Sequence, residues 1–333
     1  MTGLAVGLAL LASFGYGTGS VLVRSAVRTN TASSVALWVQ AVGFVVLVAG
    51  LAVVRPHVSW EAVLWGLVAG ALAACGVLSF YTALQNGPIS FVAPVSAIGV
   101  VVPVVGGLFL GEHVTGSALI GLTLVVVGVV VIARSHPTRV KVDNQLTDGG
   151  IAHFVTPPGR SQLAPIHDNC KPAGFRRPRA MAAVLSVVSA LAFGVFYLVL
   201  RESTSAAAAS TGAASSDTAT VYPFGSALLV AVAVQSGSLI VTLVAALRHT
   251  VTCVRPSQKL ITYALAIGLL DVMGDLALTY AIAVGPVSLV GPLGSLDPMV
   301  AVLLASVLFK EPLTGKRLVG LSACAIGIAL VAV

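Results

Sequence analysis

The chain has 333 residues, of which 57% are hydrophobic and only 9% are charged, with a formal net charge of +7. Soluble domains carry about 25% charged residues, and one water-soluble core cannot absorb this much apolar surface, so the composition excludes a soluble protein. The basic residues lie between apolar runs, which favours anchoring at the membrane surface over nucleic-acid binding.

The apolar runs predict an all-α integral membrane protein. A helix needs about 20 apolar residues to cross the bilayer, and lipid offers no other partner for backbone groups. The first run begins without a basic leader or a cleavage site, so we interpret it as a retained span. Ten predicted transmembrane helices follow one another: 3–23, 32–54, 61–83, 88–110, 115–133, 181–200, 222–247, 260–282, 286–309 and 317–333.

Two polar segments interrupt these runs. Residues 135–180 are rich in proline and basic residues, which predicts a flexible linker. Residues 203–220 are almost entirely Ser, Thr, Ala and Gly, which predicts a mobile low-complexity loop. The linker divides the chain into a first five-helix repeat, 1–134, and a second, 181–333.

An internal repeat relates these halves. The turn Gly-Pro-x-Ser at 87–90 recurs at 285–288, and a Glu-x-x-Thr-Gly turn at 112–116 recurs at 311–315. Because each half has an odd number of spans, a linker that stays on one side makes the second half enter from the opposite side. We therefore expect two inverted-topology repeats with a site at the membrane midplane between them.

Weaker matches extend the repeat. Residues 14–17, Phe-Gly-Tyr-Gly, resemble residues 191–194, Leu-Ala-Phe-Gly. In the fifth and tenth spans, glycines 121 and 128 match glycines 320 and 327. Small faces of this kind let membrane helices approach closely.

The distribution of lysine and arginine predicts the orientation. Sixteen of the 18 basic residues fall on the side of the linker, and only Arg55 and Arg201 fall on the other side. The positive-inside rule then places the linker in the cytoplasm and both termini outside.

Three acids lie deep in predicted spans, where charged residues are costly and are by default functional. Asp271 and Asp275 are four residues apart in the eighth span and share a helix face, and Asp297 lies in the ninth span. Two such close carboxylates resist both being ionised, so we expect the pair to share a proton and to bind substrate or protons. The alternative is a structural role, a hydrogen bond to a neighbouring helix or to a broken backbone near Pro292 and Pro298. Gln40 and Gln235 lie at comparable depth and are further candidates for substrate binding, with interhelical hydrogen bonding as the alternative.

The acids have no counterparts in the first half. The sequence repeat aligns Leu72 with Asp271 and Gly76 with Asp275. It aligns Asp297 with residue 98 or 99. The predicted scaffold is symmetric and its chemistry is not.

Prolines inside two spans are candidates for kinks that bend during gating. Each proline removes a backbone donor and frees a carbonyl one turn earlier, although a plain kink is the alternative. They occur at Pro94 and Pro103 in the fourth span and at Pro292 and Pro298 in the ninth.

The chain shows no motif for catalysis, for a cofactor or for metal ligation: H-E-x-x-H, G-x-S-x-G and the Walker A pattern are all absent from the sequence. We therefore expect no enzyme, no cofactor and no resident metal. The expected partners are a small-molecule solute and the lipid bilayer, with protons as an option, and no nucleic acid.

Ten spans in two halves, the Gly-Pro-x-Ser turns and the Glu-x-x-Thr-Gly turns resemble the EamA type of the drug/metabolite transporter superfamily, over residues 3–134 and 181–333. The resemblance implies alternating-access transport of small metabolites, often export. Asp271 matches an aspartate that bacterial members commonly carry. Asp275 and Asp297 differ from the family pattern, because members often have asparagine and tyrosine at these two positions. Members usually have both termini in the cytoplasm, the opposite of the orientation that the charges predict here.

We therefore predict a secondary transporter in the plasma membrane that moves a small metabolite or drug-like solute by alternating access, with proton-coupled export as one form. We expect the third, fourth, eighth and ninth spans to line the central cavity. The alternatives are a transporter of cations such as divalent metals, which would use the intramembrane aspartates, and a non-transporting membrane scaffold or receptor.

Overall fold

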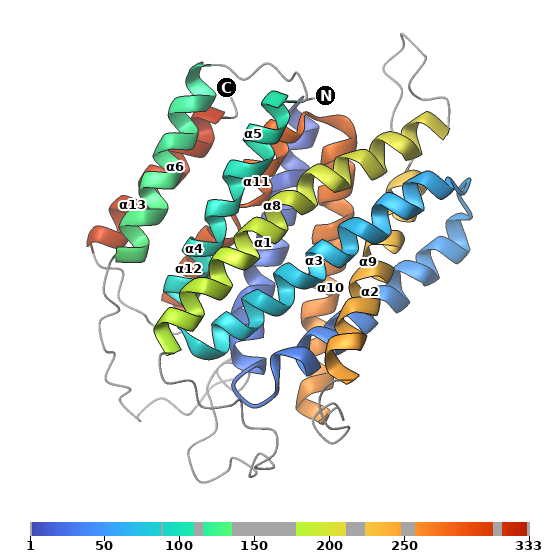
Figure 1. Cartoon of the computed structure of the whole chain (residues 1–333), viewed down its shortest axis with the longest axis horizontal. Coiled ribbons are helices and arrows are strands. Elements are labelled where there is room, and N and C mark those ends of the chain that lie inside the picture. Colours follow the sequence, from blue (N-terminus) through green and yellow to red (C-terminus); the bar gives the residue numbers. More distant parts are fainter. Residues whose placement is uncertain are drawn as a thin grey trace.

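The computed structural model is helical wherever it describes the chain, and it contains no strand in those parts. They comprise residues 2–87, 89–109, 116–134, 178–210, 224–247, 257–308 and 315–331. Residues 135–177 of the predicted linker lie outside the described residues, as do the glutamates of the two Glu-x-x-Thr-Gly turns. The linker prediction is wrong for residues 178–180, which already belong to a helix. Figure 1 shows the helices as one bundle in which segments of both halves alternate.

The elements of the first half are α1 (Thr2–Ala26), α2 (Ala32–Val54), α3 (Trp60–Asn86), α4 (Ile89–Ser96), the 3-10 segment η1 (Ala97–Val100), α5 (Val101–Phe109) and α6 (Gly116–Arg134). Those of the second half are α8 (Pro178–Ser210), α9 (Phe224–Leu247), α10 (Gln258–Val284), α11 (Val287–Gly294), α12 (Asp297–Leu308) and α13 (Gly315–Val331).

Seven helical stretches in the described part of the chain are long and apolar enough to cross a membrane: Gly3–Ala26, Ala32–Val54, Trp60–Asn86, Ala180–Ser210, Phe224–Leu247, Gln258–Val284 and Val287–Leu308. The three remaining predicted spans have helices at their positions but do not meet this criterion. The span predicted at 88–110 is divided among α4, η1 and α5, and those at 115–133 and 317–333 correspond to α6 and α13.

Many alanines are buried inside the bundle beside larger apolar residues, and many large apolar side chains are exposed on its outside. Alanines such as Ala69 and Ala74 of α3 are completely buried, whereas Val53 is 84% exposed and Phe109 is 87% exposed. A water-soluble monomer rarely exposes large contiguous apolar patches, but helices in lipid need no polar surface there. The distribution agrees with a multi-pass membrane protein.

The sequence repeat is also a repeat of element boundaries. α3 and α10 have 27 residues each, and both their first and their last residues are 198 positions apart. The hydroxyl of Ser59 accepts a hydrogen bond from the Ala62 backbone at the start of α3, as that of Ser257 does from Leu260 at the start of α10. Such N-caps supply an acceptor to a helix end that has free donors.

Both spans that follow these helices are broken at the same place. α4 and α11 have eight residues each and again lie 198 positions apart. α4 runs into η1 from Ala97, and α11 ends in a turn at Ser295 and Leu296. Each break lies between the two prolines of its span. Pro103 and Pro298 lie in the first turn of the following helix, where the missing donor costs little, and Pro298 cannot donate to the carbonyl oxygen of Gly294.

Contacts between the halves are reciprocal. α1 packs on α10 and α12, whereas α8 packs on α3, η1 and α5. A methyl group placed on Gly17 of α1 would lie 2.7 Å from the carbonyl oxygen of Asp297. A methyl group placed on Gly194 of α8 would lie 2.7 Å from the carbonyl oxygen of Gly99. Figure 1 shows that α1 begins near the top of the view and α8 near the bottom.

Glycines also permit the close crossing of α3 and α9. A methyl group on Gly70 would lie 1.9 Å from the carbonyl oxygen of Val234, and one on Gly237 would lie 2.2 Å from that of Leu67. Any larger residue would force these two helices apart. This crossing holds α2, α3 and α9 together beside the cavity described below.

The prediction of a low-complexity loop at 203–220 is wrong for its first eight residues, because α8 continues to Ser210. Ser203 and Thr204 are buried, and the Ser203 hydroxyl donates a 2.7 Å hydrogen bond to the backbone oxygen of Ala62. Packing against α3 keeps this polar sequence helical. Residues 211–220 lie outside the described part of the chain.

Candidate functional site

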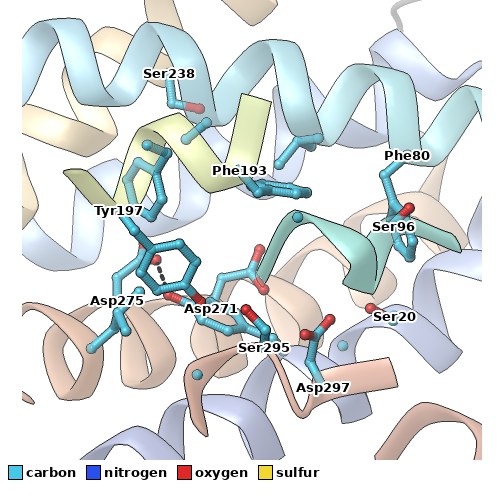
Figure 2. Close-up of a pocket in the computed structure, with 18 of the residues that line it drawn as sticks. Ser20, Phe80, Ser96, Phe193, Tyr197, Ser238, Asp271, Asp275, Ser295 and Asp297 are labelled. Carbon is cyan, nitrogen blue, oxygen red and sulfur yellow. Dashed lines mark hydrogen bonds between the residues drawn. The ribbon is translucent and has the colours of Figure 1, made fainter. Parts of the chain in front are cut away.

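A cavity of about 150 Å³ lies inside the bundle between the two halves. This is about ten times the volume that one water molecule needs on the same measure, so a small organic molecule fits better than a bare ion. The expected third, fourth, eighth and ninth spans do line it, but so do α1, α2, α8 and α9. Figure 2 shows the lining residues from several helices converging on one space.

The structure brings the three predicted acids to this cavity. Asp271 and Asp275 lie one turn apart on α10, and Asp297 is the first residue of α12, directly after the break. All three are partly exposed to the cavity. The carboxylate at the break of the ninth span therefore lies at the same cavity as the carboxylates in the middle of the eighth span.

Only one of the three carboxylates receives a hydrogen bond from a side chain within the described residues. The Tyr16 hydroxyl of α1 donates to Oδ1 of Asp275 at 2.7 Å. A methyl group on Gly19, one turn along α1, would lie 3.4 Å from Oδ1 of Asp271. The absence of a side chain at Gly19 leaves space beside Asp271.

The two predicted glutamines also line the cavity, and they hydrogen-bond each other. Nε2 of Gln235 donates to Oε1 of Gln40 at 2.7 Å and to its backbone oxygen at 2.9 Å. Nε2 of Gln40 donates to the hydroxyl of Ser238. This geometry joins α2 to α9, the alternative role that the sequence left open. A role in substrate binding stays a prediction.

The rings of Tyr16 and Phe193 fix how the two halves correspond around the cavity. The Tyr16 ring would lie 2.7 Å from a methyl group on Gly274 of α10, and the Phe193 ring 2.8 Å from one on Gly76 of α3. Gly76 and Gly274 are 198 positions apart, as are the ends of their helices. Tyr16 of α1 and Phe193 of α8 therefore occupy matching places.

This register corrects the sequence alignment of the acids. Asp271 corresponds to Ala73 rather than Leu72, and Asp275 corresponds to Val77 rather than Gly76, because the offset of 198 holds along the whole of α3 and α10. Both Ala73 and Val77 line the cavity.

The contacts of Gly17 and Gly194 pair Asp297 with Gly99, one of the two positions that the sequence allowed. On α1 and α8, the alignment that matches Tyr16 with Phe193 also pairs Gly19 with Phe196 and Ser20 with Tyr197.

The cavity thus has two corresponding walls of different chemistry. We call one the acidic wall; it consists of Tyr16, Gly19, Ser20, Asp271, Asp275 and Asp297. We call the other the aromatic wall; it consists of Ala73, Val77, Gly99, Phe193, Phe196 and Tyr197. In the view of Figure 2, Phe193 lies above the cavity and Asp297 below it.

The four predicted gating prolines belong to the broken helices that border the cavity. Pro292 lies inside α11 and is buried, and Pro103 is buried in α5, where its ring would meet a methyl group on Gly291 at 2.8 Å. Pro94 lies in α4 and Pro298 in α12, and the structure describes only their backbone. A gating role for these residues stays a prediction.

Sequence reasoning missed the residues that surround the acids. Tyr16 and Phe193 were noted only as part of a repeat, and Ser20, Tyr197 and Ser238 were not noted at all. The repeat itself could have indicated Tyr16, because the first half has a tyrosine at this position and the second half has a phenylalanine. The remaining residues carry polar groups that are ordinary in any membrane helix.

Comparison with known proteins gives a match over almost the whole chain. The EamA-like transporter family matches residues 3–134 and 180–333. An uncharacterized protein of Methanocaldococcus jannaschii, MJ1333.1, is 33% identical over 73 residues, which are 22% of this chain and 53% of that protein. The chain thus spans about half the length of this curated relative.

A solved crystal structure of a protein matches with a TM-score of 0.65 and 15% sequence identity, covering 98% of this chain and 95% of that one. At this identity the likeness shows the fold alone. The family match covers both halves, including the helices that carry the acidic wall, and the chain belongs to the EamA-like transporter family.

Proposed function

We propose that the protein is a secondary transporter that moves a small metabolite or drug-like solute across the plasma membrane by alternating access. The single observation that carries this proposal is the acid-lined cavity between the two halves, beside the break in the ninth span. Intramembrane acids that face a cavity are typical of substrate or ion pathways. The family match supports transport of a small solute rather than catalysis.

The proposed architecture is a pair of inverted five-helix repeats with ten spans. Reciprocal packing of α1 on α10 and of α8 on α3 supports a pseudo-two-fold relation. The opposite directions of α1 and α8 in Figure 1 support inversion. In transporters of this kind, the site lies at the midplane between the repeats, and rocking of one repeat against the other exposes it to either side.

The broken helices are the proposed moving parts. α11 and α12 meet at a turn that lines the cavity through Ser295, and α11 contacts α5 of the other half where Gly291 meets Pro103. A bend at this turn would change both the cavity and the contact between the halves. This coupling supports the gating role predicted for the prolines.

Asp271 is the proposed binding group for substrate or proton, with Asp275 and Asp297 adjusting it. Asp271 and Asp275 are one turn apart on a helix with low-dielectric surroundings, so a proton or a cation between them relieves their repulsion. We further propose the charge-based orientation, with the linker in the cytoplasm and the termini outside.

Transport of a divalent metal is the second candidate, and one observation counts against it. Within the described residues, no group of three or more His, Cys, Asp or Glu side chains lies close enough to hold a metal ion. A hard cation such as Mg²⁺ or Ca²⁺ takes six or more oxygen ligands. A scaffold or receptor that transports nothing would not need carboxylates inside the bundle.

The test uses the full chain purified into liposomes that carry an internal pH indicator. Amines, amino acids and sugars are added outside, and a solute-dependent pH change in the lumen is expected for at least one class. The change should vanish in Asp271→Asn and persist in the control Glu61→Gln, because Glu61 is an exposed acid at the start of α3, away from the cavity. Transport by Asp271→Asn at the wild-type rate would refute the assignment of the site.

A further inference from the structure

The two walls of the cavity differ at corresponding positions, and this difference indicates the chemistry of the ligand. Every carboxylate lies on the acidic wall, and the matching positions of the aromatic wall are Ala73, Val77 and Gly99. Gly19 of the acidic wall has no side chain, whereas the matching residue of the aromatic wall is Phe196. A ligand that contacts both walls meets negative charge at one end and rings at the other.

The charge of the cavity is not balanced by the protein side chains that line it. Three aspartates face it, and among the described residues its lining includes no lysine, arginine or histidine. The Tyr16 hydroxyl donates a hydrogen bond to Asp275, whereas no side chain in the described part of the chain donates one to Asp271 or Asp297. These two carboxylates have acceptor oxygens available for a donor that the ligand brings.

The aromatic wall suits the rest of such a ligand. Phe193 and Phe196 line the cavity, and Phe80 of α3 adds a third aromatic residue. A cation over the face of an aromatic ring is attracted by the electrons of the ring, more strongly when water is excluded, and the rings also bury apolar groups. The carboxylates of the acidic wall repel an anionic solute.

Resting on the transport function proposed above, we propose that the solute is an organic amine, with an ammonium group held between Asp271 and Asp297 and an apolar or aromatic group against Phe193 and Phe196. The ammonium has three donors, which the two open carboxylates and Ser20 or Ser295 can accept. Charge-assisted hydrogen bonds of this kind are about twice as strong as neutral ones. At Gly19 no side chain stands between α1 and Oδ1 of Asp271, which a methyl group there would meet at 3.4 Å.

The test measures binding by calorimetry to the full chain in lipid nanodiscs, so that it does not depend on transport. The probes are 2-phenylethylamine and tryptamine, which have both an ammonium group and a ring; 2-phenylethanol, which has only the ring; ethylamine, which has only the ammonium; and phenylacetate, which has the opposite charge. We expect at least one of the two ring-bearing amines to bind tenfold or more tightly than the alcohol or ethylamine. Phenylacetate should not bind.

Two variants separate the two walls. Asp271→Asn should weaken the amine tenfold or more without changing the alcohol, and Phe193→Ala should reduce the preference for 2-phenylethylamine over ethylamine. Glu61→Gln should bind like the wild type, and thermal unfolding shows that each variant is folded. Failure of both ring-bearing amines to bind folded wild-type protein overturns the proposal, as does equal binding of phenylacetate.

The outcome is distinguishable from failure of the transport proposal. If the amine binds with this selectivity but does not cross the liposome membrane, the ligand class stands and the transport function falls. If another solute is transported while no ring-bearing amine binds, the transport function stands and the ligand class falls.

Discussion

Tyr16 and Phe193 occupy corresponding places in the two halves, each with its ring against a glycine of the helix on which it packs, but only Tyr16 has a hydroxyl, which donates to Asp275 at 2.7 Å. The position matching Asp275 is Val77, whose side chain cannot accept a hydrogen bond. A donor and its acceptor are therefore present together in one half-site and absent together from the other. This pair of positions is one place where the two halves of the cavity differ in chemistry.

The first prediction concerns this hydrogen bond. Tyr16→Phe keeps the ring packed on Gly274 but removes the donor, so unfolding in detergent should require about 1–3 kcal/mol less free energy. Asp275→Asn should cost less, because its amide oxygen can still accept from Tyr16. Denaturant unfolding followed by circular dichroism measures both, and a larger loss for Asp275→Asn would show that the carboxylate has another structural partner.

The crossing of α3 and α9 supplies a second prediction. Gly70→Ala places a methyl group 1.9 Å from the carbonyl oxygen of Val234, so we expect overpacking to cost about 1–3 kcal/mol and to lower the melting temperature. The matched control is Gly7→Ala in α1, where no atom lies within 4 Å. That change should leave stability unchanged or raise it by up to about 1 kcal/mol. Equal melting temperatures for both variants would contradict the close crossing.

The glutamine pair can be tested with a double-mutant cycle. Gln40→Ala and Gln235→Ala each break the link between α2 and α9, so the second change should cost less once the first has been made. Hydrogen bonds between membrane helices contribute about 0.6 kcal/mol on average and up to about 1.7, which sets the expected coupling energy in the unfolding measurements. Strict additivity would mean that the two amides act separately, as independent substrate contacts would.

The break before α12 should control the rate of transport rather than affinity. Pro298→Ala restores a backbone donor that can reach the carbonyl oxygen of Gly294 and extend the helix across the turn. We expect slower solute uptake into liposomes with ligand affinity in nanodiscs within about twofold of wild type, a change of about 0.4 kcal/mol. A variant that loses affinity and rate in parallel would place Pro298 in the binding site instead.

Orientation has its own test, in a segment outside the described residues. A variant that retains Cys170 as its only cysteine is treated in intact cells with a membrane-impermeant thiol reagent. The excess of basic residues on the linker side predicts no labelling until the cells are opened. Prompt labelling of intact cells would place the linker outside and reverse the orientation.

The positions of the deep acids and of the helix breaks follow from the sequence because their physical signals are local. A carboxylate inside an apolar run is costly wherever the chain folds, so Asp271 and Asp297 stand out at once. Two prolines in one span likewise predict kinks, and the structure interrupts both spans between their prolines, at Ala97–Val100 and at Ser295.

The walls of the cavity could not be predicted in the same way because they depend on which helices of the two halves meet. Tyr16 becomes a partner of Asp275 only when α1 packs on α10. The helical state of residues 203–210 depends on the contact of Ser203 with α3, which no local preference of serine or threonine reveals. The one-residue error in aligning the acids comes from an offset of 199, which holds at the Glu-x-x-Thr-Gly turns, whereas the offset is 198 along α3 and α10 and at the Gly-Pro-x-Ser turns.

The last helix of each half packs mainly on that of the other. α6 and α13 lie side by side at one edge of the bundle, where a methyl group on Gly128 would lie 2.6 Å from the carbonyl oxygen of Gly320 (Figure 1). Each half produced alone would leave this seam open to lipid. Two separately synthesised halves thus carry a matching edge through which they can reassemble, and a split version of the protein, cut within the linker, would regain its shape when both pieces share a membrane.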